Sequence, residues 1–416
     1  MIKNYRKLII VLLGLYFISP HGFGLSFLGL QSLDLPKLIP FILSIIIIFK
    51  FNFKKVDTST FLFLIFIILH FLSIIYSNSF KRSIYEFISH LVLYYPGYLF
   101  SYLILKSEKS IKDLLKIINV VVIAYVFFSI TEFLFQFNFF DLIRNNYIAE
   151  KSRFNNNLGM IRLGFKASMG PFGSTLALAY TFITLFFLKD LYVPKFLKSK
   201  IRRVIIDILS VLGIFFTLSR AAIFTVLFLL IFKNLFQNKI KKSVTFLVFI
   251  SIISLFALQQ IKETNFENYL NNYVLNIFEA DSNGSQSRVS NNLVDFNFAL
   301  KRPFTGHGAG MLYYSKTTAG GGVLESSDSS YLISILADRG FISLTIFLIL
   351  IIITFRRAYF LTKYKNDDFN YNSLIYSFTA LFLCINSSQR GELFFLFFLL
   401  IGLINKIYIL KSKHIC

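Results

Sequence analysis

The 416-residue chain has no tryptophan, only two cysteines, and 21 acidic residues against 43 basic ones. Cys384 lies within an apolar stretch and Cys416 is the last residue, so their placement favours neither a disulfide nor a thiolate metal cluster. The chain also lacks an Asp-X-Asp beside an apolar run, a His-Glu-X-X-His and a Walker sequence, which leaves metal and nucleotide chemistry without a visible site. We therefore expect no metal and no cofactor.

Charged residues are scarce as well, at 15% of the chain, whereas soluble domains carry about 25%. Hydrophobic residues make up 56%, and the mean hydropathy is +0.66. Apolar runs of about 17–25 residues are long enough to cross a bilayer, where a helix satisfies its backbone hydrogen bonds within one segment. The chain is therefore predicted to be an all-α polytopic integral membrane protein, and its interfacial aromatic belt has to be tyrosine.

The apolar runs predict about twelve transmembrane helices. They lie near 8–28, 36–50, 59–76, 87–105, 115–137, 169–188, 203–218, 221–236, 243–258, 329–355, 371–387 and 393–410. Nine fall within 1–258, which also holds an outer segment at 138–168, and three fall within 329–416. Between helices nine and ten lies a large extracytoplasmic loop at 259–328, here called the cap loop. Basic residues before the first run, with no small-residue cleavage site after it, indicate an uncleaved helix.

The formal charge of +22 and the pI of 9.8 come from Lys and Arg at the ends of the spans, not from one basic domain. Orientation by the positive-inside rule produces this distribution, so nucleic-acid binding is a poor interpretation. Placing the short basic loops in the cytoplasm puts both termini there and the cap loop on the outer face. A single large cap without an internal sequence repeat is more typical of chemistry at that face than of solute transport.

Four arginines are predicted to lie at the outer face. Arg220 sits in a turn between two apolar runs, where a charge is costly and usually has a partner or a function. The alternative is that it extends to the interface at an ordinary helix hairpin. Arg162 and Arg288, each taken alone, are typical solvated loop charges, and Arg390 is typical of an anchor. Together the four provide planar, bidentate donors suited to phosphate or pyrophosphate oxygens.

The cap loop contains two further candidates. His307 lies in a Gly-His-Gly-Ala-Gly turn at 306–310, where it is either a base or an incidental residue of a tight turn. Asp328 falls where the cap loop meets the next span, three residues before Tyr331. It is a candidate base and equally a helix N-cap, because Asp at a helix start accepts hydrogen bonds from free backbone N–H groups.

In this order, the features resemble the polytopic O-antigen polymerase and O-antigen ligase superfamily. The resemblance covers most of the chain through short motifs: Leu218-Ser219-Arg220-Ala221, Arg288 followed by the turn at 303–308, Tyr331-Leu332 with Gly340 and Leu344, and Arg162 with Gly164 and Pro171. Ligases of this superfamily typically carry His-Asn ahead of the Tyr-Leu pair, where this chain has Asp328 and Ser329. The acidic residue favours a polymerase.

The resemblance implies a metal-independent, inverting glycosyltransferase of the bacterial inner membrane, with its active side facing the periplasm or cell exterior. It would join polyprenyl-diphosphate-linked oligosaccharide repeat units, with Asp328 as the base. Diphosphate and substrate binding are assigned to Arg220, Arg288, Arg162, His307 and Tyr331. The expected partners are the lipid-linked oligosaccharide, membrane lipid and a protein that regulates chain length.

Two other functions stay open. A ligase would use the same lipid-linked donor and requires a histidine base, for which His307 is the only nearby residue. A flippase or other transporter requires charges on several membrane helices, yet few spans carry any. The main exceptions are Glu132, Asp207, Arg220 and the adjacent Asp338 and Arg339, of which Asp207 is expected to pair with a neighbour and the last two to offset each other's charge.

Overall fold

The structure is a computed structural model that describes residues 2–19, 24–25, 33–50, 56–138, 140, 161–162, 165–172, 174–236, 285–312, 330–364, 368–387 and 391–412. Apart from two short antiparallel pairs, the elements in these ranges are helical, as the sequence predicts. The α-helices are α1 (Ile2–Ile18), α2 (Leu35–Lys50), α3 (Thr58–Leu72), α4 (Phe80–Ser89), α5 (Pro96–Ile104), α6 (Glu108–Phe135), α9 (Thr175–Lys189), α10 (Lys200–Phe216), α11 (Arg220–Phe236), α14 (Ser285–Leu300), α16 (Tyr331–Thr362), α17 (Asn372–Ser387) and α18 (Gly391–Ser412). The pairs are β1 (Gly24–Leu25) with β2 (Leu33–Asp34), and β3 (Ile161–Arg162) with β4 (Phe165–Lys166).

Four helical segments of the described chain are long and apolar enough to cross a membrane by length and composition: Thr58–Tyr76, Glu108–Phe135, Tyr331–Thr362 and Leu393–Ser412. Shorter apolar helices occupy Ile9–Ile18, Lys37–Ile46 and Ala221–Lys233. The predicted span at 87–105 is interrupted by a π-helical turn at His90–Tyr94, after which α5 begins at Pro96. The predicted span at 243–258 lies outside the described residues.

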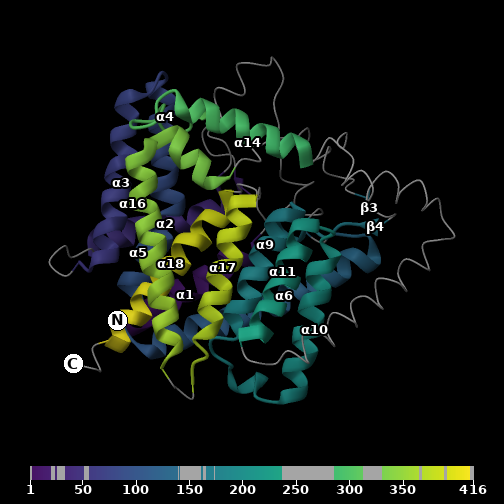
Figure 1. The fold of residues 1–416 in the computed structure, drawn as a ribbon. Coiled ribbons are helices and arrows are strands. Elements are labelled where there is room, and N and C mark those ends of the chain that lie inside the picture. The colour runs from purple at the N-terminus through teal and green to yellow at the C-terminus, as the bar shows by residue number, and fades with distance from the viewer. Residues whose placement is uncertain are drawn as a thin grey trace.

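Helix α18 forms the centre of the bundle, because 78% of the residues in its most apolar window are buried. It packs closely against α5, where a Cβ atom added to Gly97 would stand only 2.4 Å from the carbonyl oxygen of Phe395. Small residues at such contacts let two helix backbones approach within a membrane. Figure 1 shows α18 and α17 surrounded by the other helices of the bundle, with α14 crossing one end.

Ion pairs gather at one end of the bundle, here called the basic end. Asp57, the N-cap of α3, lies 2.8 Å from the Arg357 guanidinium on the last part of α16. Lys189, at the end of α9, pairs with both Asp190 and Asp207. The expected pairing of Asp207, on α10, with a neighbour is therefore confirmed, because its carboxylate pairs with Lys189.

The opposite end, here called the cap end, is formed where the last part of the cap loop meets the ends of α3 and α4. Arg302 donates a hydrogen bond to the carbonyl oxygen of Tyr76 at 2.9 Å, just beyond α3. Ser83 of α4 donates to the carbonyl oxygen of Ala309 at 2.8 Å. The segment 302–312 is thus fixed to elements more than 200 residues earlier in the chain.

Candidate functional site

A break inside α16 gives the cap end its shape. Gly340 has φ 79° and ψ 176°, which interrupts the helix nine residues after it begins. The N–H group of Phe341 consequently donates to the carbonyl oxygen of Pro303 at 2.6 Å. A Cβ atom at Gly340 would lie 2.1 Å from the carbonyl oxygen of Phe304. Only glycine combines this φ with such a close backbone approach, which accounts for Gly340 in the sequence motif.

Asp338 fastens the glycine-rich turn to this break. Its carboxylate accepts hydrogen bonds from the N–H groups of Gly310 at 3.1 Å and Leu312 at 2.9 Å. The carbonyl oxygen of Asp338 accepts a third bond, from the N–H group of Gly308 at 2.9 Å. The neighbouring Arg339 points elsewhere, with one guanidinium nitrogen 3.3 Å from the Tyr95 hydroxyl. The two adjacent charges therefore have separate partners, and Asp338 acts as the anchor of the turn.

His307 is held by contacts within the protein. Its Nε2 atom donates to the carbonyl oxygen of Phe298 at 2.8 Å, and the imidazole stacks on the Phe298 ring at 3.9 Å. Its backbone N–H donates to the carbonyl oxygen of Ala337 at 2.9 Å. Burial lowers the pKa of His307, so the imidazole is neutral at pH 7. These contacts tie α14 to the break in α16.

The start of α16 is held by two neighbouring helices. Asn386 of α17 accepts hydrogen bonds from the Ser330 hydroxyl at 2.9 Å and from the N–H group of Leu332 at 3.2 Å. Asn292 of α14 accepts from the N–H group of Ser330 at 3.3 Å. Tyr331 is 1% exposed and packs into the core of the bundle. The backbone that follows Asp328 in sequence is thus fixed by both α14 and α17, although Asp328 itself lies outside the described residues.

The turn that precedes α11 carries Arg220 as the first residue of that helix. Leu218, with φ 49°, reverses the chain after α10, and the Ser219 side chain accepts a hydrogen bond from the N–H group of Ala222 at 3.4 Å. The N–H group of Ser168 donates to the carbonyl oxygen of Phe216 at 2.9 Å, which ties this turn to the chain entering α9. The Arg220 backbone is therefore well fixed, while its side chain lies outside the described part.

A buried carboxylate organises the chain between β4 and α9. Glu132, near the end of α6, accepts hydrogen bonds from the N–H groups of Met169 and Gly170, each at 2.9 Å. It also accepts from the Ser168 hydroxyl at 3.1 Å and the Asn138 side chain at 2.9 Å. Glu132, one of the few charged residues predicted within a membrane span, therefore has a structural role. It secures the segment that follows Arg162.

The predicted arginines differ in how far the structure places them. Arg162 lies in β3 and Arg288 lies in α14, but nothing beyond their backbone is described. Arg390 falls outside the described residues. In Figure 1, α14 crosses the top of the bundle, and α11 and β3 lie below it. Among the side chains that the structure does describe, no three of His, Cys, Asp and Glu converge as a metal ion would require.

Removing the Asp338 carboxylate is expected to destabilise the fold. Asp338→Ala removes the carboxylate that accepts hydrogen bonds from the buried N–H groups of Gly310 and Leu312, and each lost bond costs about 1–3 kcal/mol. Ser343→Ala is the matched control on the same helix, because the buried Ser343 hydroxyl has no hydrogen-bond partner. Thermal unfolding is followed in detergent by dye labelling of the buried Cys384 thiol, with Cys416→Ser in both proteins. An unfolding temperature for Asp338→Ala equal to that of the control would contradict the assigned role.

Sequence comparison adds independent information about this region. Residues 205–348 match the family model described as O-Antigen ligase. No curated protein matches the chain. The matched region runs from α10 through the break in α16 and includes Arg220, Arg288, His307 and Asp328, but not Arg162. The match supports glycan transfer of the polymerase or ligase type, and the apolar helices are consistent with a membrane protein. The match over residues 205–348 therefore confirms the resemblance to the O-antigen polymerase and ligase superfamily.

Proposed function

We propose that this protein is a polysaccharide polymerase that joins polyprenyl-diphosphate-linked oligosaccharide repeat units at the outer face of the bacterial inner membrane. The observation that carries the proposal is the family match, because one matched segment contains Arg220, Arg288, the anchored turn at 306–312 and Asp328. The described contacts support it, since α14 and the start of α16 are fixed to one another at the cap end. About twelve spans with both termini in the cytoplasm remain part of the proposal.

The proposed orientation places the basic end in the cytoplasm and the cap end outside. The support is the distribution of charge: Arg357, Lys189 and Lys233 all form ion pairs at the basic end. Positive residues are retained on the cytoplasmic side of membrane proteins. A donor sugar that has crossed the membrane on its lipid would then meet the cap end, and its lipid chain would lie against the bundle.

The proposed chemistry is a displacement at the anomeric carbon of the growing chain. A hydroxyl of the incoming lipid-linked unit attacks this carbon, its proton passes to Asp328, and the bond to the diphosphate oxygen breaks. The lipid diphosphate leaves with the bonding electrons, so negative charge develops there. Arg220, Arg288 and Arg162 are proposed to stabilise this charge through fixed guanidinium groups.

A ligase is the second candidate, and the description of the matching family favours it. Its histidine base would have to be His307 in this chain. Nε2 of His307 donates to the carbonyl oxygen of Phe298, so only Nδ1 is left to accept the proton of an acceptor hydroxyl. The acidic residue at 328 favours the polymerase.

The choice of acceptor separates the two activities. Purified protein is incubated with its lipid-diphosphate-linked repeat unit, with and without a lipid A core acceptor, and the products are separated on a gel. A polymerase forms a ladder of increasing chain length from the repeat unit alone. Transfer of preformed chains to the core, with no ladder, would establish the ligase. If correctly inserted protein carries out neither reaction, the result favours the flippase or transporter function.

A further inference from the structure

In the described part of α14, residues 292–300, several large apolar side chains are exposed while a carboxylate is buried. Asp295 and Ala299 face the bundle and are 1% and 0% exposed. Leu293, Phe296 and Leu300 are 59%, 42% and 52% exposed. Residues three and four apart lie on one side of a helix, so these three form a continuous apolar stripe. A helix surrounded by water would expose its polar side instead.

The stripe continues beyond the helix. Phe304, four residues after Leu300, is 68% exposed, and we call Leu293, Phe296, Leu300 and Phe304 the cap stripe. The hydrogen bond from the N–H group of Phe341 to the carbonyl oxygen of Pro303 holds this segment against α16. The Phe341 side chain is itself 55% exposed. The cap stripe is therefore continuous with the exposed apolar side of a helix that is long enough to span a membrane.

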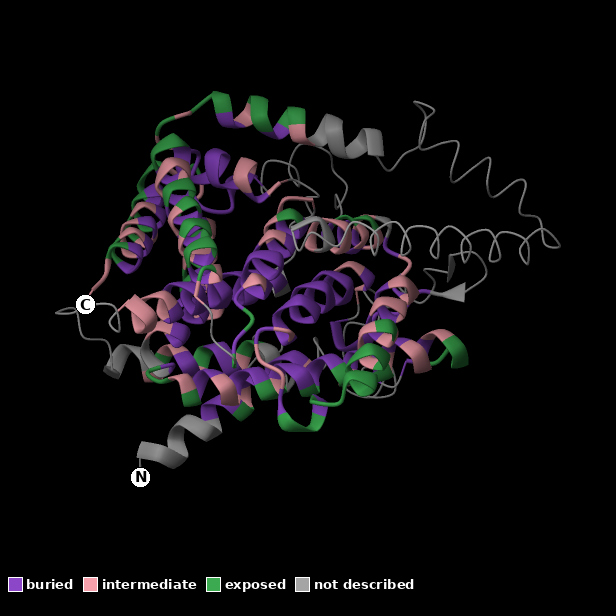
Figure 2. Cartoon of the chain, turned by 60° about the horizontal axis from the view of Figure 1, so that its bottom comes forward, coloured by how far each residue is buried: buried purple, intermediate pink, exposed green. Residues whose placement is uncertain are grey.

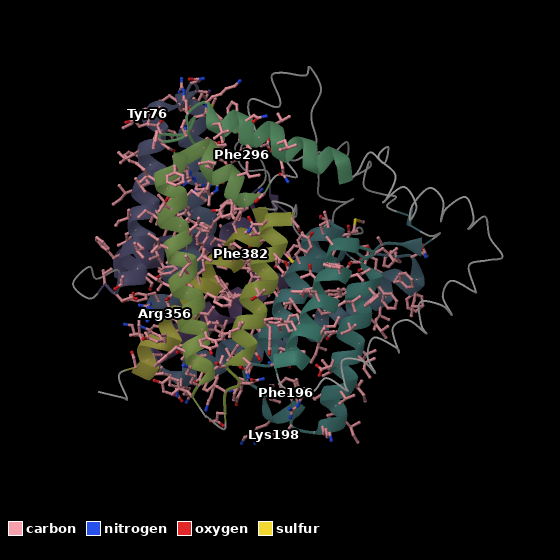
Figure 3. The ribbon with its side chains drawn as sticks, in the orientation of Figure 1. Tyr76, Phe196, Lys198, Phe296, Arg356 and Phe382 are labelled. Carbon is pink, nitrogen blue, oxygen red and sulfur yellow. The ribbon has the colours of Figure 1, made fainter. Side chains whose placement is uncertain are left out.

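The same continuity exists toward α3. Arg302 bonds the carbonyl oxygen of Tyr76, and the adjacent Ile75 is 68% exposed at the end of a second candidate span. Figure 2 shows exposed residues along one edge of α14 and along α16, and Figure 3 places Phe296 and Tyr76 toward the same end of the molecule. Exposed apolar sides of membrane spans contact lipid. A surface continuous with two of them is expected to do the same.

We propose that α14 is an interfacial helix whose cap stripe lies in the outer leaflet of the bilayer. Burial of these large apolar side chains among lipid chains removes them from water, which stabilises this placement. Exposed Lys301 and Arg302 border the stripe, and such cations pair with lipid phosphate groups. On the proposed function, this anchoring keeps Arg288, on the same helix, at the depth of the donor diphosphate.

The depth of the stripe is measured by fluorescence quenching in the full-length protein. Leu293→Cys and Phe296→Cys are labelled separately with an environment-sensitive dye, in a Cys416→Ser background where Cys384 stays buried. The protein is reconstituted into phosphatidylethanolamine and phosphatidylglycerol vesicles that contain nitroxide-labelled lipid. Ile352→Cys, on the exposed side of α16, is the lipid control. Lys198→Cys, exposed beyond α9, is the aqueous control (Figure 3).

The expected result is a blue-shifted emission at positions 293 and 296, with strong quenching by the nitroxide lipid and weak quenching by iodide. Position 198 should show the reverse. Quenching by iodide alone at both stripe positions would overturn the proposal, because the stripe would then face water. Protection from both quenchers would also overturn it, because protein would then cover the stripe. The unfolding temperature of each labelled variant is compared with that of the unlabelled protein, to show that the label leaves the fold intact. If one variant fails this control, the other stripe position still provides the test.

Discussion

Arg288→Ala and Arg220→Ala are each expected to abolish detectable chain growth. If each guanidinium stabilises charge on the departing diphosphate, its removal costs roughly 10²–10³ in rate, since a preorganised donor of this kind supplies several kcal/mol. Arg288→Lys should recover only part of the activity, because an ammonium group cannot form the planar, bidentate contact. The rate of ladder formation from the lipid-linked repeat unit is the measurement.

Arg202→Ala is the matched control for the arginine variants. Arg202 is an exposed residue on α10 whose one described hydrogen bond is long, at 3.4 Å to the carbonyl oxygen of Phe196. It lies at the opposite end of α10 from the turn that carries Arg220. All variants should insert and unfold like the unsubstituted protein. Normal product from both Arg288→Ala and Arg220→Ala would refute the diphosphate role.

Asp328→Asn and His307→Gln are expected to have opposite outcomes. A positioned base contributes about 10²–10⁴ in rate, so Asp328→Asn should lose that factor while keeping the size of the side chain. His307→Gln should retain most activity, because the glutamine amide can still donate to the carbonyl oxygen of Phe298. Initial rates with the lipid-linked repeat unit distinguish the two positions. Retained activity in Asp328→Asn together with a loss in His307→Gln would reverse the assignment and favour the ligase.

The sequence predicted the architecture better than the individual contacts. Apolar runs and basic loops correctly indicated a helical membrane protein, because bilayer thickness constrains the length and composition of each segment. The apolar runs did not indicate the π-helical turn at His90–Tyr94 that interrupts the predicted span at 87–105, since aromatic and aliphatic residues continue through it. Nor did they indicate that α1 covers Ile2–Ile18 where a span at 8–28 was predicted. The number of spans thus depends on breaks that hydropathy does not register.

The site illustrates a different limit. Glycines at 306–310 correctly signalled a tight turn, yet Asp338, which anchors that turn, lies 26 residues beyond Leu312 in the sequence. Its adjacency to Arg339 predicted that the two charges offset each other, and they do attract one another. The hydrogen bonds of Asp338 to Gly310 and Leu312 were not predicted, because sequence alone shows neighbours and not partners across the fold. Asn292 and Asn386 also escaped notice, since a single asparagine carries no pattern. His307 was predicted as a base, a substrate-binding residue or an incidental residue of the turn, and the fold adds its hydrogen bond to the carbonyl oxygen of Phe298, which the sequence did not indicate.

The most direct test of the proposed reaction counts the lipid diphosphate released for each glycosidic bond formed. Purified protein extends its lipid-linked repeat unit in the presence of a metal chelator, and both products are quantified over time. The mechanism predicts one lipid diphosphate per new linkage, at a rate that added Mg²⁺ does not change. Chain growth without diphosphate release, or growth that stops with chelator and resumes with Mg²⁺, would contradict it.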